Sequence, residues 1–287
     1  MDVETEEMTA ELAEELAANN TRRAVDTKTM PARFGNLKAV GQSPAHGFAS
    51  FQSAFDPETL ALRMGSGLHA VLFEDRPVIM WTGKVRNGKV WQAFKDQHSG
   101  KIILSAKEYA RAQEIAAAVR RHPIAANLLF GPDTIREHTI MWEQLGRSRR
   151  STPDVRGPYH VCELKSTRCA EPSKFNRDGA FRAYHVQLAD QCLAIEAETG
   201  KRPEEAYIVA VESVRPYAVT VLQLTEQTLR KGEHLARLWL ERLISCERSG
   251  LWPGYTEQIE VFDVPDDGFD LAFVDEIEEV QAWKERE

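Results

Sequence analysis

Residues 153–165 read PDVRGPYHVCELK, and the other patterns in the chain are best understood from this stretch outward. Residues 156–158 have the composition of a tight turn. Residues 159–164 alternate apolar and polar side chains, as a half-buried strand does. The pattern predicts a hairpin that brings Asp154 beside Glu163.

The hairpin would also create a site for a divalent cation. Glu163 and Lys165 are two residues apart, so both side chains point to the same face of the strand. Carboxylate oxygens from Asp154 and Glu163 suit Mg²⁺, and Mn²⁺ is able to substitute. A metal here would lower the pKa of a bound water, while Lys165 would orient or deprotonate that water or stabilise developing charge. The same spacing also occurs by chance on ordinary surface hairpins, so the stretch needs support from the rest of the chain.

Composition indicates a globular protein of an ordinary kind. The chain has 287 residues, of which 43% are hydrophobic and 28% charged, enough for one large domain or two small ones. Its four cysteines form no CxxC pair, which favours reduced thiols in a cytoplasmic protein. No apolar run approaches the length of a membrane span, and the N-terminus lacks the apolar segment of a secretory signal.

Charge is distributed unevenly along the chain. The net charge is −8, but residues 1–17 carry seven acidic and no basic side chains, and residues 257–287 carry twelve acidic and two basic ones. Residues 18–256 therefore have a balance of +9. A basic middle is compatible with a polyanionic partner, although solvated charged faces would give the same count. We expect an acidic N-terminal tail over residues 1–29, a domain over 30–255 and an acidic segment over 256–287.

Periodicity and capping signals predict the elements of this domain. In chain order they are short helices within 30–62, a buried helix over 64–74, hairpin strands over 77–91, a helix over 105–121, a strand over 136–142, a loop over 166–177, a helix over 178–199, paired strands over 206–214 and 217–224, and a helix over 225–249. This order predicts an α/β fold with a mixed central β-sheet flanked by helices.

Further polar residues stand out against these elements. Arg149 and Arg150 precede the hairpin and are candidates for contacts with phosphates, although arginines beside a loop are often just solvated. Tyr184, Gln187 and Gln191 share one helix face, and the first two could look into the site. His69 lies in an apolar helix, where a lone histidine is more often a hydrogen-bonded core residue than a ligand.

Taken in order, these pieces resemble one known family. Residues 30–255 resemble the RecE-type (exodeoxyribonuclease VIII-like) phage exonucleases, in the RecB-like branch of the PD-(D/E)XK nuclease superfamily. The residues that carry the resemblance are Ser43 to His46, Met64 to His69, Glu137, Arg150, Pro153-Asp154, Glu163 to Thr167, Tyr184 to Gln187, Pro216 to Val219 and Trp252 to Tyr255.

The resemblance implies a restriction-endonuclease-like core and assigns roles to single residues. His69, Asp154, Glu163 and the carbonyl of Leu164 would hold the metal. Lys165 would assist the attacking water, and Glu137 would be an accessory acid. Gln187 and Tyr184 would contact substrate or orient the lysine. Two positions depart from the pattern: Glu163 stands where RecE-type proteins usually have Asp, and Gln191 stands where many RecB-like nucleases have Tyr.

The function implied is that of a Mg²⁺-dependent exodeoxyribonuclease. It would degrade duplex DNA from its ends, 5′ to 3′, to leave single strand for phage-type homologous recombination. The expected partners are double-stranded DNA ends, a single-strand annealing recombinase (RecT/Bet-like) and further copies of the chain in a ring-like homo-oligomer, a trimer or tetramer. Two alternatives stay open: a structure-specific or single-strand DNA endonuclease of the same superfamily, and a non-catalytic DNA-binding or adaptor protein on the same fold.

Overall fold

The computed structural model describes residues 26–52, 59–73, 76–256 and 258–262. Its elements are η1 (Thr27–Thr29), α2 (Phe34–Gln42), α3 (Pro44–Gln52), α4 (Leu60–Phe73), β1 (Val78–Trp81), α5 (Gly88–Gln97), β2 (Ile102–Ser105), α6 (Ala106–Arg121), α7 (Pro123–Phe130), β3 (Ile135–Arg136), β4 (Ile140–Gln144), β5 (Arg147–Ser151), β6 (Val155–Arg156), β7 (His160–Thr167), α8 (Pro172–Phe181), α9 (Tyr184–Thr199), β8 (Glu205–Glu212), β9 (Val219–Gln223) and α10 (Glu226–Ser249).

The chain divides into two units, residues 1–252 and 253–287. All elements named above belong to the first unit. In the second unit the described residues are exposed and form neither helix nor strand. Within the described residues, no helix combines the length and the apolar character that a membrane crossing requires.

A five-stranded sheet in the described residues carries the predicted hairpin. Its strand order is β3-β6-β7-β8-β9, and β7 is the central strand. β6 and β7 are antiparallel, β7 and β8 are parallel, and β8 and β9 are antiparallel, so the sheet is mixed. The predicted α/β fold class with a mixed central sheet is therefore confirmed.

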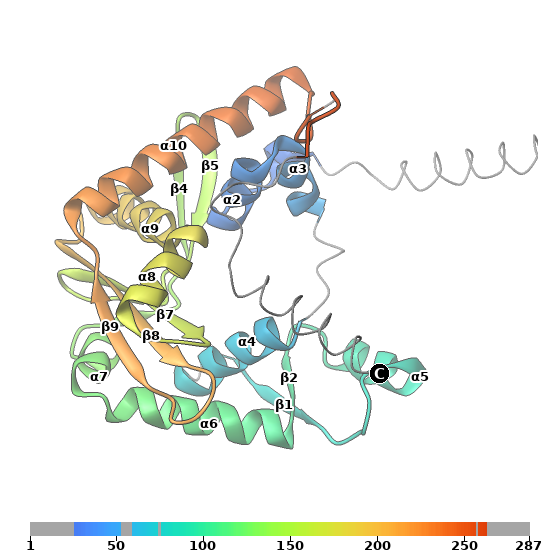
Figure 1. The fold of residues 1–287 in the computed structure, drawn as a ribbon, viewed down its shortest axis with the longest axis vertical. Coiled ribbons are helices and arrows are strands. Elements are labelled where there is room, and N and C mark those ends of the chain that lie inside the picture. The colour runs from blue at the N-terminus through green and yellow to red at the C-terminus, as the bar shows by residue number, and fades with distance from the viewer. Residues whose placement is uncertain (1–25, 53–58, 74–75, 257, 263–287) are drawn as a thin grey trace, which may run out of the picture. The chain divides into compact units, whose positions relative to one another are not determined.

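Helices cover both faces of this sheet (Figure 1). Alternate side chains of β7 point to opposite faces. Cys162 and Leu164 join a core with α4, α6 and α7, whereas Val161 joins a core with α8 and α9. Glu163 and Lys165, which alternate with Leu164, therefore face α9.

A second helical layer fixes the position of α9. α10 packs against α9 (Figure 1), and Gly232 of α10 has no room for a side chain. A Cβ atom at this position would overlap the His185 carbonyl oxygen and lie 2.8 Å from the Ala189 Cβ. Only glycine allows the two helices to approach so closely.

The hairpin predicted over residues 77–91 is wrong. β1 ends at Trp81, and the second half of the segment begins helix α5. β1 instead pairs in parallel with β2, across the intervening helix. Trp91 and Phe94 are three residues apart and both contact the Trp81 ring, with centroids 5.2 and 4.8 Å away, so helical spacing is what brings the aromatic rings together.

Two other boundaries also differ from expectation. The strand predicted over 136–142 is interrupted at Glu137, whose φ of +51° lies in the left-handed region, so β3 and β4 are separate strands. The helix predicted from Asp178 is two helices, because α8 begins at Pro172 and Ala183 adopts a φ of +59° before α9. The sequence does contain a start signal for α8. Pro172 occupies the first helical position, and the Glu171 carboxylate caps the helix.

The helices over 105–121 and 225–249 are as predicted. Ser105 and Glu108 form the capping box of α6, and Thr225 caps α10. The buried helix predicted over 64–74 is α4, which begins four residues earlier. Residues 26–29, expected in the acidic tail, include η1, and the Thr27 side chain is buried; the rest of that tail lies outside the described residues.

Candidate metal centre

The hairpin places Asp154 and Glu163 side by side, as predicted. Val155 pairs with Cys162, so the preceding Asp154 lies opposite Glu163. The Leu164 amide donates a hydrogen bond of 2.7 Å to Asp154 Oδ2, and the Asp154 amide lies 3.4 Å from Glu163 Oε1. Both residues are buried, with exposed fractions of 7% and 1%.

Burial of two neighbouring carboxylates changes the acidity of the pair. Burial raises the pKa of Asp154, and the Glu163 charge raises it further, to about 7. His69 and Lys165 oppose this effect without cancelling it. An additional positive charge at this point would relieve the repulsion, which is the condition for a cation site.

His69 approaches the same point from α4. Its Nδ1 lies 3.1 Å from Glu137 Oε1 and 3.7 Å from Asp154 Oδ1. Burial alone would lower the pKa of His69, but the surrounding carboxylates of Asp154, Glu137 and Glu163 raise it to about 9. The histidine is thus part of the polar site rather than a residue of the apolar core.

The strand break at Glu137 explains how this acid reaches the site. In its left-handed conformation, the Glu137 amide donates a hydrogen bond of 3.0 Å to the Asp154 carbonyl oxygen. One ligand atom each from His69, Glu137 and Asp154 lie within 4.8 Å of one another. Two carboxylates and an imidazole are a donor set that fits a divalent metal. The residues present therefore fit the cation implied by the sequence, and the role of Glu137 as an accessory acid near the metal stays a prediction.

Glu163 is held by a different set of contacts. Oε2 accepts hydrogen bonds from Lys165 Nζ at 2.5 Å and from Gln187 Nε2 at 2.9 Å, and Oε1 accepts one from Gln191 Nε2. Glu163 lies outside the three-residue group around His69, so its service as a direct metal ligand stays a prediction.

Lys165 is enclosed between Glu163 and an aromatic ring. Its Nζ lies 5.1 Å from the centre of the Tyr184 ring. Burial lowers the pKa of Lys165, but the charges of Glu163 and Asp154 raise it by more, so the net shift is upward. The side chain is therefore an ammonium group held by its carboxylate partner.

The Leu164 carbonyl stays a predicted ligand. The N–H and C=O of one strand residue project from the same side of the strand. Since the Leu164 amide points at Asp154, its carbonyl faces the side on which the buried carboxylates lie.

Gln191 has a larger role than its sequence pattern predicts. It shares a helix face with Tyr184 and Gln187, and its spacing of four from Gln187 is the signal that points to the site. The resemblance makes it a departure from the family pattern, yet its side-chain amide reaches Glu163. The structure thus brings both glutamines to the same carboxylate.

The prediction that Arg149 contacts DNA is wrong. Arg149 is fully buried, where it pairs with Asp190 at 2.5 Å and lies 4.9 Å from the centre of the Trp142 ring. A guanidinium group that is buried and paired with a carboxylate cannot reach a phosphate. Arg150 is half-buried and lines a small cavity of about 270 Å³ with Gln187 and Gln191, so its contact with DNA stays a prediction.

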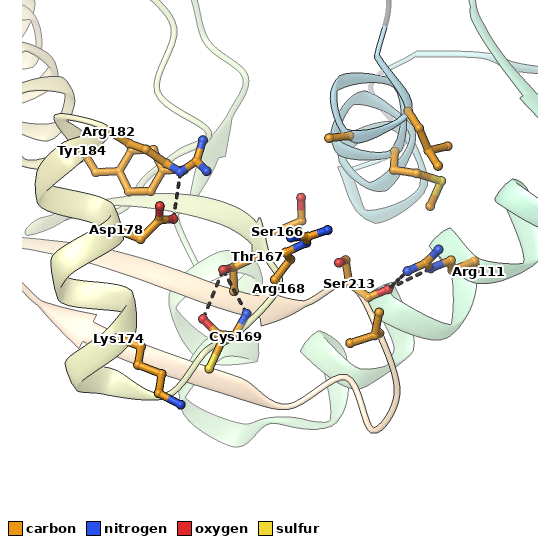
Figure 2. A pocket seen from close by; sticks show the side chains of 14 residues that line it. Arg111, Ser166, Thr167, Arg168, Cys169, Lys174, Asp178, Arg182, Tyr184 and Ser213 are labelled. Carbon is orange, nitrogen blue, oxygen red and sulfur yellow. Dashed lines mark hydrogen bonds and ion pairs between the residues drawn. The ribbon is translucent and has the colours of Figure 1, made fainter. Parts of the chain in front are cut away.

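A larger groove lies at the end of β7, and its lining includes Tyr184, whose ring centre is 5.1 Å from Lys165 Nζ. It has a volume of about 850 Å³ and is lined by residues of α4, α6, α8 and the segment after β7. Figure 2 shows Lys174, Asp178 and Arg182 of the α8 region on one side and Arg111 on the other. Together with Arg168, the lining carries four basic side chains and one acidic side chain. This balance favours an anionic ligand.

Comparison with known proteins agrees with the fold. A family model described as "PDDEXK-like domain of unknown function (DUF3799)" matches residues 34–265. No curated protein matches the sequence. A crystal structure from Eubacterium rectale, provisionally named an exonuclease, is similar with a TM-score of 0.60 and 14% identity, over 86% of this chain and 94% of that one. An alkaline exonuclease from Laribacter hongkongensis matches with a TM-score of 0.32 and 15% identity, over 66% of this chain and 93% of that one.

Proposed function

Because the chain belongs to the PDDEXK-like family of unknown function (DUF3799), we propose that it is a metal-dependent nuclease that hydrolyses phosphodiester bonds of DNA. The observation that carries the proposal is the convergence of His69, Glu137 and Asp154 next to the Glu163–Lys165 pair. A fold similarity alone would not indicate an activity, since one fold serves many functions. The site combines donors for a metal ion with the ammonium group of Lys165, and phosphodiester hydrolysis can use both.

The side chains have separable roles in this proposal. A divalent cation held by His69, Glu137 and Asp154 would supply Lewis acidity and a bound water of lowered pKa. Lys165 donates hydrogen bonds to the attacking water or to a phosphoryl oxygen as negative charge develops. Glu163 fixes the position of Lys165, and the two glutamines fix Glu163.

The basic groove at the end of β7 supports a polynucleotide substrate. Its four basic side chains provide charge for the sugar-phosphate backbone on one side of the reacting phosphate. We propose that the substrate is duplex DNA degraded from its ends, 5′ to 3′, with Mg²⁺ as the metal. The exonuclease name of the Eubacterium rectale structure supports action at ends.

The partners follow from the resemblance and are proposals of the same kind. A ring-like homo-oligomer would keep a DNA end threaded during successive cuts. A single-strand annealing recombinase would receive the exposed strand. Light scattering on the purified protein tests the first, and co-purification with a RecT/Bet-like annealing protein tests the second.

The nuclease proposal is tested with end-labelled linear duplex DNA in the presence of Mg²⁺, Mn²⁺ or EDTA. The expected result is metal-dependent release of nucleotides from linear DNA, while closed circular duplex stays intact. Equal cutting of closed circles, or cutting restricted to single strands, would instead indicate the endonuclease alternative.

Lys165→Ala separates the enzyme from a non-catalytic DNA-binding protein. The variant removes the ammonium group but leaves His69, Glu137 and Asp154 in place, so DNA is still bound while turnover is abolished. Wild-type protein that binds DNA but releases no nucleotide with either metal would contradict the nuclease and favour the adaptor.

A further inference from the structure

A basic segment lies between α4 and α6 in the sequence and takes no part in the site described above. It comprises residues 76–105, which include β1, α5 and β2, and is called the basic arm here. Its charged residues are Arg76, Lys84, Arg86, Lys89, Lys95 and Lys101 against a single acid, Asp96. A net charge of +5 in 30 residues contrasts with the −8 of the whole chain.

The arm has its own small aromatic core. Trp81 contacts Trp91 and Phe94, and Phe94 in turn contacts His98 with ring centroids 4.4 Å apart. These rings are occupied by one another and are not stacking platforms for bases. None of the residues of α5 is buried, so the remaining faces of the helix are open.

Close packing attaches the arm to the helix that carries His69. At Gly67 of α4, a Cβ atom would lie 2.8 Å from Leu104 Cδ1 of β2. His69 follows two residues later on the same helix. The position of the arm is therefore fixed relative to one of the candidate metal ligands.

A carboxylate of α6 adds a second attachment. Glu108 pairs with Arg86 of the arm at 2.5 Å and with Arg63 of α4 at 3.0 Å. The same carboxylate accepts a hydrogen bond of 2.7 Å from the Ser105 amide at the end of the arm. Arg86 is thus structural, and the charge available to a partner comes from the lysines.

The lysines of the arm are exposed to solvent. Lys84 precedes α5, and Lys89 and Lys95 lie in its first and last turns. Within the described ranges none of these three forms an ion pair, whereas the exposed arginines of α10 at 230 and 237 are paired with glutamates. Exposed, uncompensated lysines are depleted in protein–protein interfaces and are typical of surfaces that bind phosphate backbones.

We propose that the basic arm binds the phosphate backbone of duplex DNA, outside the reaction centre. This inference rests on the proposed function for the presence of DNA, and it adds a second contact region to the site. Because the contacts come from lysine charge and not from base stacking, binding through the arm is independent of sequence and weakens with salt. The arm holds the duplex while α4 keeps the metal site in register with it.

The test is a triple variant, Lys84→Ala/Lys89→Ala/Lys95→Ala, which leaves Arg86 and the aromatic core intact. Binding of a fluorescent duplex is measured by anisotropy in EDTA, so that no hydrolysis is needed. We expect Kd to rise about tenfold or more at ~0.1 M salt, and the slope of log K against log salt to become shallower by about 0.9 for each phosphate that the variant no longer neutralises. Cleavage of a substrate only a few nucleotides long is expected to keep its wild-type rate.

A matched control removes the same charge elsewhere. Lys28, Lys201 and Lys231 lie outside the arm, and their triple alanine variant is expected to change Kd less than about twofold. Equal weakening by both triples, or an unchanged Kd and salt slope in the arm variant, would overturn the proposal. So would wild-type protein that fails to bind duplex DNA.

Two further readouts separate the possible causes. If the arm variant alters the oligomeric state in light scattering but not the affinity for DNA, the arm is an interface between copies of the chain and the proposal is wrong. If wild-type protein binds DNA through the arm but cuts none, the arm is supported while the nuclease proposal fails.

Discussion

The side-chain amide of Gln191 on α9 donates a hydrogen bond to Oε1 of Glu163 on β7, while Gln187 binds Oε2 at 2.9 Å. Two turns of one helix therefore fix both oxygens of one buried carboxylate. The same carboxylate holds Lys165. The position of the ammonium group thus depends on a helix that contributes none of the three grouped metal donors.

Gln191→Leu removes the donor while keeping much of the side-chain volume. We expect kcat to fall about 10–100-fold, because Glu163 is held by one amide fewer and Lys165 becomes less well positioned. The affinity for Mn²⁺ should change little, since Gln191 lies outside the group of His69, Glu137 and Asp154. Gln191→Tyr restores a donor through its hydroxyl group and should retain more activity than the leucine variant.

Stability of the metal-free protein is expected to fall as pH rises. The pKa of Asp154 is raised to about 7 in the folded state, so the folded state binds this proton more tightly than the unfolded state. The stabilisation from Asp154 therefore disappears between pH ~4 and ~7. His69, with a pKa raised to about 9, stabilises the fold below pH ~6.5, and this effect disappears toward pH 9.

Thermal melting in EDTA between pH ~5 and ~9 measures this dependence. Asp154→Asn removes the carboxyl group and should flatten the curve below pH ~7. A melting temperature of wild-type protein that rises steadily over this range would be inconsistent with the raised pKa values.

The donor set predicts a preference between two metals. Imidazole ligands suit Mn²⁺ better than Mg²⁺, which prefers oxygen. Mn²⁺ should therefore bind more tightly, and His69→Asn should weaken Mn²⁺ more than Mg²⁺, as measured by isothermal titration calorimetry. Equal weakening for both metals would mean that His69 supports Glu137 and Asp154 without binding the metal.

Metal binding must also displace protons from the site. The His69 proton competes with Mn²⁺ below pH ~9, so the apparent affinity should fall by up to about tenfold per pH unit there, and more steeply below pH ~7, where the Asp154 proton competes as well. Titrations at pH ~6 and ~8, in buffers with different ionisation enthalpies, count the protons released. Release of no more protons at pH ~6 than at pH ~8 would argue against Asp154 as a ligand.

Arg149 and Arg150 are adjacent in sequence but should behave in opposite ways. Arg149→Met leaves Asp190 buried without its partner, so the free energy of unfolding should drop by about 3–5 kcal/mol. Arg150→Met should change stability by less than about 1 kcal/mol and weaken DNA binding instead. Urea unfolding and duplex anisotropy measure the two effects, and adding Asp190→Asn should recover part of the stability that Arg149→Met removes.

The hairpin could be predicted from the sequence because its signals are local. The turn at residues 156–158 fixes the register, and register alone places Asp154 beside Glu163. The half-buried strand expected over 159–164 is wrong, because residues 161–164 are buried on both faces of the sheet. The capping box at Ser105 and the cap at Thr225 are equally local, and both helices follow them.

What the sequence could not supply depends on tertiary packing. Arg149 looks like any arginine beside a loop, and only the fold shows that Asp190 and Trp142 enclose it. Asn87-Gly88 is a turn signal in isolation, but the ring of Trp81 stabilises a helix that follows it. Glu137 reaches the site because its own backbone is left-handed, and an alternation pattern does not reveal such a conformation.

Gly232 shows how far such dependence extends. It contributes nothing chemical, yet any larger residue there would press on the carbonyl of His185, at the start of the helix that carries both glutamines. A screen of random substitutions for loss of activity would therefore detect Gly232, which lies on the outer layer of helices and away from every candidate metal ligand. Designers who wish to adjust the enzyme without touching its polar residues could start from that contact.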